Sequence, residues 1–362
     1  MEDHAFLLIW RFKISPMKPI NTALCSYGMS GLVFHGPLLE AHPGYTVGKI
    51  LERNRHESKG KHPGAQLVRN FEAIIEDPSI ELVVVNTPDH LHLDMATRAI
   101  QAGKHVVVEK PFTLLTSEAD QLIELAEKQG VILSVYQNRR WDGVYLTVKE
   151  VLASGKLGRL VDFEVHFDRF RNYIKESWKD QANGTGTLYN LGSHLIDQTL
   201  DLFGMPDRLF CDTRMLRDGA LTDDSYDLWL HYPEFKCMLR SSYLVREQGP
   251  SFMLHGTKGS FLSWGSDPQE RDLKAGLIPG SEGWGVDPSF SHAKINTDYK
   301  GEHMEGNYPL LPGNYLAYYD NIYEVIRNKA KLIVKPRQAR DVIRVIEAAY
   351  QSSRKGEVVR LR

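Results

Sequence analysis

The sequence contains only three cysteines among its 362 residues, and Cys25, Cys211 and Cys237 lie far apart. Cysteines this few and this scattered supply neither a disulfide framework nor a zinc site. A reducing, cytoplasmic compartment is therefore expected. Long hydrophobic runs are also missing: the apolar run from Ala5 to Trp10 is well below the ~18 residues of a membrane span. No membrane association is expected, and no bound metal.

An excess of positive charge is missing as well. Lysine and arginine total 44 against 46 aspartates and glutamates, which gives a net charge of −2. Proteins that bind nucleic acids usually carry a strongly basic domain, so no nucleic-acid partner is expected. The length predicts about two domains. We predict a first domain over 17–140 and a second over 141–362. Residues 1–16 are interpreted as a non-native or disordered extension, and a genuine N-terminal arm is the alternative.

The first domain alternates short apolar runs with amphipathic segments. This alternation is typical of βαβ units around a parallel sheet. Continuous apolar runs such as Leu82-Val83-Val84-Val85 are typical of strands covered on both faces. Val68, Phe71 and Ile75 lie at helical spacing. The predicted strands are 20–25, 46–51, 82–85, 105–108 and 131–136, and the other predicted helices are 95–102 and a segment from 117 to 130.

The pattern changes after about residue 150. Val161, Phe163, Val165 and Phe167 alternate with polar residues, and similar alternation follows in 225–230 and 237–244. A period of two predicts strands with one face on a core, as in a mainly antiparallel sheet. Residues 265–312 are rich in glycine and proline and are predicted as long loops. Two helices, near 314–328 and 336–353, close the chain.

The first strand ends in Ser26-Tyr27-Gly28-Met29-Ser30-Gly31. A dinucleotide-binding turn has the pattern G-x-G-x-x-G, and Ser26 stands here in place of the first glycine. Gly28 would let the backbone approach a pyrophosphate, and Gly31 would let the next helix pack against the sheet. The N–H groups at the helix start favour phosphate. We assign Ser26, Tyr27, Gly28, Met29 and Ser30 to cofactor binding; a purely structural turn is the alternative.

The second strand ends at Glu52-Arg53, 24 residues after Gly28. An acidic residue about 20 residues after the turn usually binds the adenosine ribose. A guanidinium can instead take a 2′-phosphate and stack on the adenine. Glu52 and Arg53 together do not decide whether the cofactor is NAD or NADP, and we favour NADP. A solvated charge pair is the other interpretation.

Two further strands end in polar turns, one with Thr87, Pro88 and His92, the other with Glu109 and Lys110. Ligands of open α/β sheets bind beyond the carboxyl ends of the strands, so both turns are expected to face the cofactor. Burial would make Lys110 useful in proton transfer. A surface lysine would be the commoner case for Lys110 taken alone.

These motifs, with Gly103-Lys104-His105-Val106 and the segment from Gly186 to Asp197, resemble the Gfo/Idh/MocA oxidoreductase family from about residue 17 to the end. Segments around Gln137, Phe167 and Asp267 resemble the branch that includes bacterial NADP-dependent scyllo-inositol dehydrogenases. The resemblance implies a Rossmann domain, a C-terminal α/β domain with a large open sheet, and hydride transfer between nicotinamide and a sugar or polyol carbon. It implies that Lys110 and His194 sit beside the reacting hydroxyl, with His194 as the general base.

One departure from the family pattern is Asn190, where the residue four before the histidine is commonly aspartate. Asparagine can orient a substrate but cannot carry charge, so we expect an altered pH dependence or substrate choice. Arginines and aromatics after residue 161 suit a polyhydroxylated ring, and would equally suit a carboxylate or phosphate. A solvated loop is the alternative. The predicted substrate set is Asn138, Arg139, Arg171, Trp178 and Asp197.

The resulting prediction is an NAD(P)-dependent dehydrogenase or reductase acting on CH–OH groups of a sugar, polyol or inositol. A redox-assisted NAD-dependent glycosidase and a non-catalytic dinucleotide or sugar sensor are the alternatives. Retention of both Lys110 and His194 argues against a sensor. By analogy, an open sheet face would expose an apolar patch and favour a homodimer or homotetramer.

Overall fold

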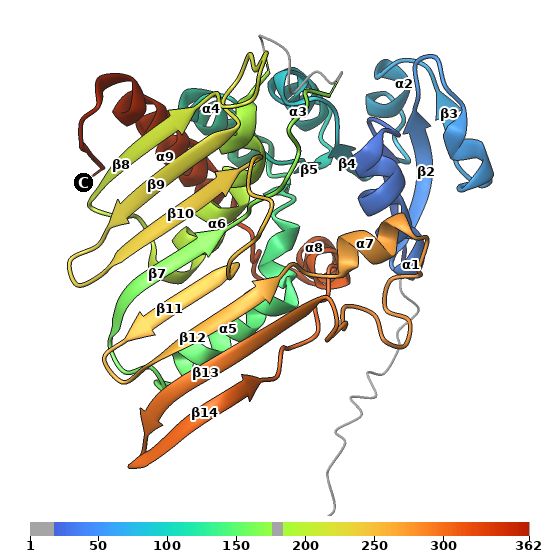
Figure 1. The fold of residues 1–362 in the computed structure, drawn as a ribbon. Helices are drawn as coiled ribbons and strands as arrows, with labels where there is room; N and C mark the ends of the chain where they lie inside the picture. The colour runs from blue at the N-terminus through green and yellow to red at the C-terminus, as the bar shows by residue number, and fades with distance from the viewer. Residues whose placement is uncertain (1–17, 176–183, 362) are drawn as a thin grey trace, which may run out of the picture.

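The computed structural model describes residues 18–175 and 184–361, so the predicted extension 1–16 and Trp178 lie outside the described residues. The chain forms two β-sheets with helices between and around them (Figure 1). The first sheet has the order β3-β2-β1-β4-β5-β6, and every pair in it is parallel. Its strands are β1 (Ile20–Leu24), β2 (Tyr45–Leu51), β3 (Gln66–Val68), β4 (Leu82–Val85), β5 (His105–Val108) and β6 (Leu133–Val135).

Alternate residues of these strands face different layers of helices. In β4, Val83 and Val85 belong to the apolar cluster that includes α3 (His92–Gln101) and α4 (Thr116–Gln129). Leu82 and Val84 belong to a second cluster with α1 (Gly36–Ala41) and α8 (Leu316–Asn328). Burial on both faces explains the unbroken apolar run of β4. The first domain is therefore a doubly wound parallel sheet, and its layer of helices includes α8 from the far end of the chain.

The second sheet has nine strands in the order β14-β13-β12-β11-β7-β10-β9-β8-β15. Only the pair β7 and β10 is parallel among the described strands. These two sheets confirm the predicted fold class. The strands are β7 (Leu160–His166), β8 (Arg208–Arg214), β9 (Ser225–His231), β10 (Lys236–Ser242), β11 (Phe252–Gly256), β12 (Gly259–Gly265), β13 (Ser291–Tyr299), β14 (Glu302–Tyr308) and β15 (Val359–Arg360).

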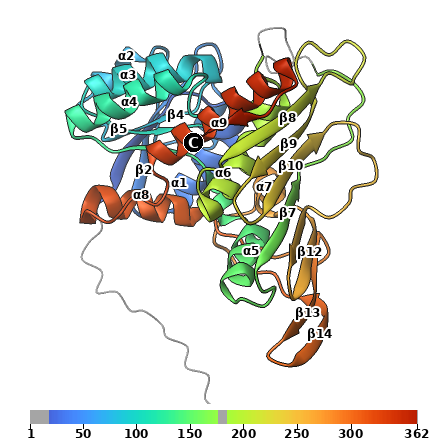
Figure 2. The ribbon, with the colours of Figure 1, turned by 90° about the vertical axis from the view of Figure 1, so that its left-hand side faces the viewer.

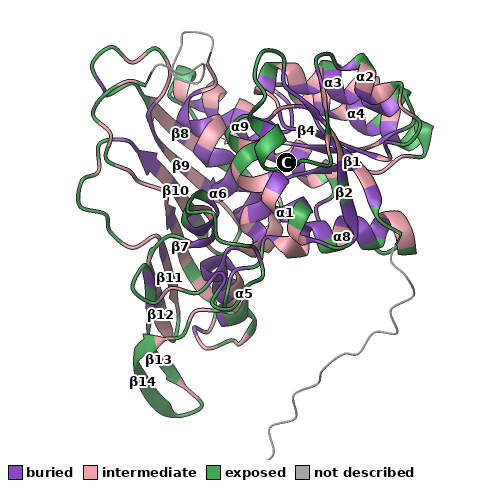
Figure 3. Ribbon diagram, turned by 90° about the vertical axis from the view of Figure 1, so that its right-hand side faces the viewer, coloured by how far each residue is buried: buried purple, intermediate pink, exposed green. Residues whose placement is uncertain are grey.

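Among the described residues, helices cover one face of this second sheet (Figure 2). Figure 2 shows the sheet nearly edge-on, with α5 (Gly143–Ala153), α6 (Ser193–Phe203) and α9 (Pro336–Lys355) on the side toward the first domain. No described helix lies on the opposite face (Figure 2). The hairpin of β13 and β14 extends from the body of the molecule, and Figure 3 shows that its outer strand is exposed.

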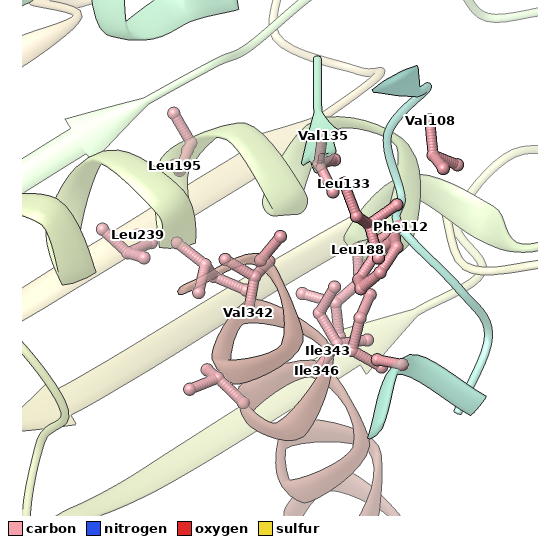
Figure 4. Close-up of a cluster of buried hydrophobic side chains, with 14 of the residues drawn as sticks. Val108, Phe112, Leu133, Val135, Leu188, Leu195, Leu239, Val342, Ile343 and Ile346 are labelled. Atoms are coloured by element: carbon pink, nitrogen blue, oxygen red, sulfur yellow. The ribbon is translucent and has the colours of Figure 1, made fainter. Parts of the chain in front are cut away.

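Helix α9 joins the two domains through a shared core. Val342, Ile343 and Ile346 of α9 pack in one cluster with Val135 of β6 and Leu239 of β10 (Figure 4). The strongly amphipathic sequence of α9 supplies this apolar stripe. The continuous core holds the carboxyl ends of the parallel strands against α6, which positions the site described below.

Two expectations for secondary structure are wrong. Val68, expected to lie in one helix with Phe71 and Ile75, belongs instead to β3, because the edge of β2 offers a backbone ladder to Gln66–Val68. The helix that follows, α2 (Glu72–Ile75), has one turn. Residues 265–312 are not loops throughout: they contain α7 (Gln269–Lys274), β13 and β14. Polar residues dominate the hairpin of β13 and β14, so its hydrophobic pattern is weak. Its position in the sheet depends on the pairing of β13 with β12.

Candidate active site

The turn after β1 is shaped by two of its glycines and one serine. The N–H of Gly28 donates to Oγ of Ser26 over 3.2 Å, so the serine hydroxyl closes the turn where the fingerprint has its first glycine. A Cβ on Gly31 would lie 2.4 Å from the carbonyl oxygen of Ser26. Only glycine therefore lets the helical segment Ser30–His35 start this close to the strand.

Asn86 fastens this turn to the end of β4. Its Oδ1 accepts a hydrogen bond from the Ser26 N–H over 2.9 Å, and its Nδ2 donates to the Ser26 carbonyl over 2.8 Å. β1 and β4 are the neighbours between which the strand order of the sheet reverses. A crevice at such a reversal is where open α/β sheets bind ligands. Asn86 directly precedes the turn of Thr87 and Pro88, and no role was predicted for it.

A cavity of about 480 Å³ opens at this point, between the parallel sheet and the second domain. Its volume lies within the range of roughly 300–1,000 Å³ usual for ligand pockets. The cavity brings together most of the residues predicted for the site, which line it as follows: Ser26, Gly28, Met29, Ser30, Thr87, Pro88, His92, Glu109, Lys110, Asn138, Arg139, Arg171, Asn190 and His194.

Three residues of the cofactor prediction do not line this cavity. Tyr27 is buried and packs edge-on against His62. Glu52 is buried, and its carboxylate accepts hydrogen bonds from the N–H groups of Glu57 and Ser58 and from the Ser58 hydroxyl. The Glu52 carboxylate, which was predicted to bind ribose, is therefore already hydrogen-bonded to residues of its own loop. Arg53, beside it, is exposed.

Asp197 does not line the cavity either. It is buried in α6 and forms a two-pronged ion pair with Arg140, with N–O distances of 2.7 and 2.8 Å. Arg140 also reaches Asp201, one turn along the same helix. The predicted substrate role of Asp197 therefore becomes a structural one, because its carboxylate anchors α6 to the segment after β6.

Lys110 meets the second domain at Asn190. The Nζ of Lys110 donates to the Asn190 carbonyl over 2.7 Å and lies 3.4 Å from Asn190 Oδ1. Asn190 belongs to a π-helical turn, Leu188–Gly192, that runs directly into α6. His194 follows four residues later and therefore lies on the same side of the helix. One ammonium, one amide and one imidazole converge on the cavity wall.

The carboxylate beside Lys110 is held in place by His35. The His35 Nε2 lies 3.0 Å from Glu109 Oε1, and the other carboxylate oxygen accepts the Lys110 N–H over 3.0 Å. Burial alone would raise the pKa of Glu109, but the His35 hydrogen bond, with Lys110, lowers it below its usual value. Glu109 is therefore an ionised carboxylate with an assigned partner on each oxygen.

His92 connects the two polar turns of the first domain. Its Nδ1 lies 2.8 Å from the carbonyl oxygen of Pro111, and its Nε2 lies 3.0 Å from that of Thr87. The ring is buried, and burial lowers its pKa. His92 forms part of the cavity wall, but its nitrogens bridge the turns after β4 and β5.

The cavity fits a nicotinamide dinucleotide. Two buried hydroxyl oxygens on its wall, Oγ1 of Thr87 and Oη of Tyr136, form no hydrogen bond with any residue the structure describes. Buried polar groups are nearly always paired, so these two hydroxyls mark places for a polar ligand. Ser26, Gly28, Met29 and Ser30 would hold the phosphates, and Thr87, Tyr136 and Lys110 would face the nicotinamide riboside.

Several cavity residues were missed by sequence reasoning. Tyr136 follows the apolar strand β6, so the rule that found Lys110 would also have found it. Asp223 accepts hydrogen bonds from the Leu188 N–H over 2.8 Å and the Tyr350 hydroxyl over 2.6 Å, and burial raises its pKa. Tyr243, whose ring lies 4.3 Å from the guanidinium carbon of Arg171, also lines the wall. No local motif distinguishes these last two residues.

A second chamber of about 390 Å³ adjoins the first. Both chambers are lined by Arg139, Arg169, Glu270 and Lys274. Phe167 and Phe290 add aromatic walls to the second chamber only. Among residues 18–175 and 184–361, no group of three or more histidine, cysteine, aspartate or glutamate side chains could hold a metal ion. Within the same ranges no helix is long and apolar enough to cross a membrane.

A doubly wound domain with a phosphate turn at its strand reversal, facing a lysine and a histidine across a cleft, defines a dinucleotide-dependent oxidoreductase. Comparison with family models supports this class. Residues 20–137 match the oxidoreductase family NAD-binding Rossmann fold, and residues 149–361 match the oxidoreductase family C-terminal alpha/beta domain. The chain belongs to the Gfo/Idh/MocA oxidoreductase family, as its motifs indicated.

Individual relatives are similar to this protein along nearly the whole chain. The scyllo-inositol 2-dehydrogenase (NADP(+)) IolW of Bacillus subtilis is 40% identical over 343 residues, which cover 94% of this chain and 96% of that protein. The oxidoreductase yvaA structure from Bacillus subtilis superimposes with a TM-score of 0.92 at 40% identity, over 96% of this chain and 99% of that one. An oxidoreductase from Bacteroides fragilis gives a TM-score of 0.88 at 46% identity, over 95% and 100%.

Proposed function

We propose that this protein transfers a hydride between NADP and a carbinol carbon of a sugar, polyol or inositol. The observation that carries the proposal is the position of Lys110, whose ammonium donates to Asn190 within one helical turn of His194. All three residues line the cavity into which the phosphate turn opens. A proton donor, a proton acceptor and a dinucleotide site together are what oxidation of a hydroxyl requires.

In the oxidation direction, His194 removes the hydroxyl proton as general base, since an imidazole titrates near neutral pH. The Lys110 ammonium donates to the same oxygen and stabilises the negative charge that develops on it. Asn190 holds the lysine through its backbone carbonyl and offers a side-chain amide to the substrate. The nicotinamide of bound NADP⁺ would accept the hydride. In the reduction direction His194 returns the proton.

The surroundings of Glu52 support NADP as the preferred cofactor. A carboxylate that bound both ribose hydroxyls would favour NAD, but the Glu52 carboxylate is taken up by Glu57 and Ser58. The exposed Arg53, next to Glu52 in the chain, then suits a 2′-phosphate. The NADP(+) in the name of the Bacillus subtilis relative agrees with this preference.

The substrate proposal rests on the far wall of the cavity. Asn138, Arg139 and Arg171 offer donors for hydroxyl groups, and the Tyr243 ring supports the Arg171 guanidinium. That relative is named for scyllo-inositol, so cyclitols belong in the first substrate panel, with aldoses and their keto forms.

The first experiment is a turnover assay. The protein is mixed with NADP⁺ or NAD⁺ and cyclitols or aldoses, and with NADPH or NADH and keto forms, while the absorbance of the reduced nicotinamide is followed. Turnover with NADP⁺ supports the proposal. Cofactor binding without any turnover would overturn it in favour of a sensor, and glycoside cleavage without net cofactor change would favour a glycosidase.

The open sheet face supports assembly into a homodimer or homotetramer, with a second copy as the occupant. Laterally paired residues form an apolar row across this face with a single carboxylate in it: Phe210, Trp229, Met238, Glu164, Met253 and Leu262. We propose that this row is covered by its symmetry-related counterpart. Light scattering should give a multiple of 41.2 kDa, and Trp229→Lys should shift it toward the monomer. A monomeric wild type would exclude this assembly.

The predicted cytoplasmic location also stays a proposal. All three cysteines are buried as free thiols, which suits a reducing compartment.

A further inference from the structure

Arg169 lies on the wall that the two chambers share. It follows β7, and its backbone is fixed on both sides: its N–H donates to the Ser242 carbonyl over 2.9 Å, and its carbonyl accepts the Val245 N–H over 3.0 Å. Its guanidinium carbon lies 5.0 Å from the centre of the Phe167 ring. The side chain is therefore carried by an ordered backbone and supported by an aromatic ring.

Two other cations on this shared wall, Arg139 and Lys274, are paired with carboxylates. Arg139 pairs with Asp142 and Glu270 at 3.0 and 2.8 Å, and Lys274 pairs with Glu270 at 2.6 Å. The Arg169 guanidinium makes no hydrogen bond and no ion pair with any residue in 18–175 or 184–361. Glu270 attracts this guanidinium without forming an ion pair with it. A largely buried charge whose donors lack hydrogen-bond partners is costly, so this cation marks a place prepared for an anion.

The charge of the first cavity, of about 480 Å³, also favours an anion. Six lysine and arginine residues line it against four aspartates and glutamates. Burial is the largest effect on the pKa of Arg169 and lowers it; Tyr243 and Glu270 raise this pKa, and Arg139 and Arg171 lower it. An anion bound here would pair with Arg169 and offset the repulsion that Arg139 and Arg171 exert on it.

We propose that Arg169 anchors an anion subsite at the junction of the two chambers, and that the substrate is a sugar or polyol bearing a carboxylate or phosphate group. This inference rests on the proposed function and adds a substrate class to it. The planar guanidinium matches both anions with two parallel hydrogen bonds. Lys110 and His194 line the same chamber as Arg169, so the charged group occupies the junction while a hydroxyl carbon lies at the reaction centre.

The test compares matched substrates with NADP⁺: glucose, glucuronate and glucose 6-phosphate, and myo-inositol with its 1-phosphate. We expect kcat/KM of the preferred acid to exceed that of its neutral partner by about tenfold or more. Glucuronate against glucose 6-phosphate identifies which anion the subsite takes. Arg169→Met should abolish the preference, while Arg169→Lys should keep part of it. Arg214→Met, on the exposed end of β8 and paired with Asp212, is the matched control.

Calorimetry of the NADP⁺ complex separates this inference from the proposed function, because binding needs no turnover. If an acid binds wild type at least tenfold more tightly than Arg169→Met, the subsite stands even where nothing is oxidised, and only the proposed function fails. If neutral substrates turn over as well as acids, and Arg169→Met slows both equally, the oxidoreductase stands and the anion subsite is overturned. Failure of every acid to bind more tightly than its neutral partner also overturns the subsite.

Discussion

The Nε2 of His35 lies 3.0 Å from Oε1 of Glu109. This contact links the helical segment Ser30–His35 to the turn that holds Glu109 and Lys110. The other ring nitrogen lies 2.6 Å from the hydroxyl oxygen of Tyr319, on α8. A neutral imidazole protonated at Nε2 satisfies both contacts, since it donates to the carboxylate and accepts from the tyrosine. Three segments far apart in the sequence thus set the direction of Glu109, and with it the backbone of Lys110.

Removing this imidazole should damage both stability and turnover. His35→Leu leaves a buried carboxylate short of one partner, which should lower the free energy of unfolding by about 1–3 kcal/mol. It should also lower kcat, because the Lys110 turn loses its support. Urea unfolding and steady-state kinetics measure the two effects. Tyr319→Phe keeps the His35–Glu109 contact and should be milder in both. Equal effects of the two variants would show that the His35–Glu109 contact contributes no more to stability and turnover than the His35–Tyr319 contact.

The reaction centre predicts a separation between binding and chemistry. Lys110→Met and His194→Gln should each lower kcat by about 10²–10⁴-fold, because each removes a proton-transfer or charge-stabilising group. NADPH affinity, measured by fluorescence titration, should change little. Lys128→Met, on the exposed end of α4, is the control for loss of a lysine. Activity within a few fold of wild type in His194→Gln would contradict its role as base.

Asn190 offers a test of the missing carboxylate. Asn190→Asp would place a negative charge beside the Lys110 ammonium and one turn from His194. A nearby carboxylate favours the protonated imidazole, so the acid limb of the kcat/KM profile should move to higher pH by about one unit. Asn190→Ser, which adds no charge, should leave the limb in place. An unmoved limb in Asn190→Asp would mean that this position does not communicate with the base.

Cofactor choice should depend on Arg53 and hardly on Glu52. Arg53→Ala should raise KM for NADP⁺ by about tenfold, the loss expected for one charged contact to a phosphate. KM for NAD⁺ should change less than threefold, on the order of the scatter among surface substitutions. Arg55→Ala, two residues further along the same exposed loop, serves as control. A parallel rise of both KM values would contradict recognition of the 2′-phosphate.

His92 should make folding sensitive to pH. Burial lowers its pKa in the folded chain, so the unfolded chain takes up a proton first as the pH falls. The stability contributed by His92 is therefore present above the ordinary value of 6.5 and is lost below it, as the pH falls toward the folded value. The slope cannot exceed about 1.4 kcal/mol per pH unit for one group.

Urea unfolding at about pH 7.5 and about pH 5.5 measures this effect, because the window spans the titration of an unfolded histidine. The acid-induced loss of stability should be smaller in His92→Gln than in wild type. His90→Gln is the control: His90 is near His92 in the chain, its side chain is exposed, and the variant should lose as much stability as wild type. An identical loss in all three proteins would place the pH sensitivity elsewhere, for example at His105, whose pKa burial also lowers.

Much of the fold could be predicted because its signals are local. The apolar runs around Val84 and Val107 and the turn at Gly28 lie at the positions that a doubly wound domain requires. The predicted phosphate turn and the turn holding Lys110 meet at one cavity because parallel strands end at the same edge of the sheet. β3 and the hairpin of β13 and β14 were not predicted, since neighbouring strands rather than their own residues stabilise them.

The sequence by itself determined the class of fold, the dinucleotide turn and the family, because these depend on short motifs and on hydrophobic periodicity. Only the tertiary structure decided which charged groups work and which merely hold the chain together. It placed Asp197 in an ion pair with Arg140, turned Glu52 onto its own loop, and left the Arg169 guanidinium without a hydrogen bond or ion pair among the described residues. Such roles depend on distances between residues far apart in the chain, and electrostatic energies are set by those distances and by burial.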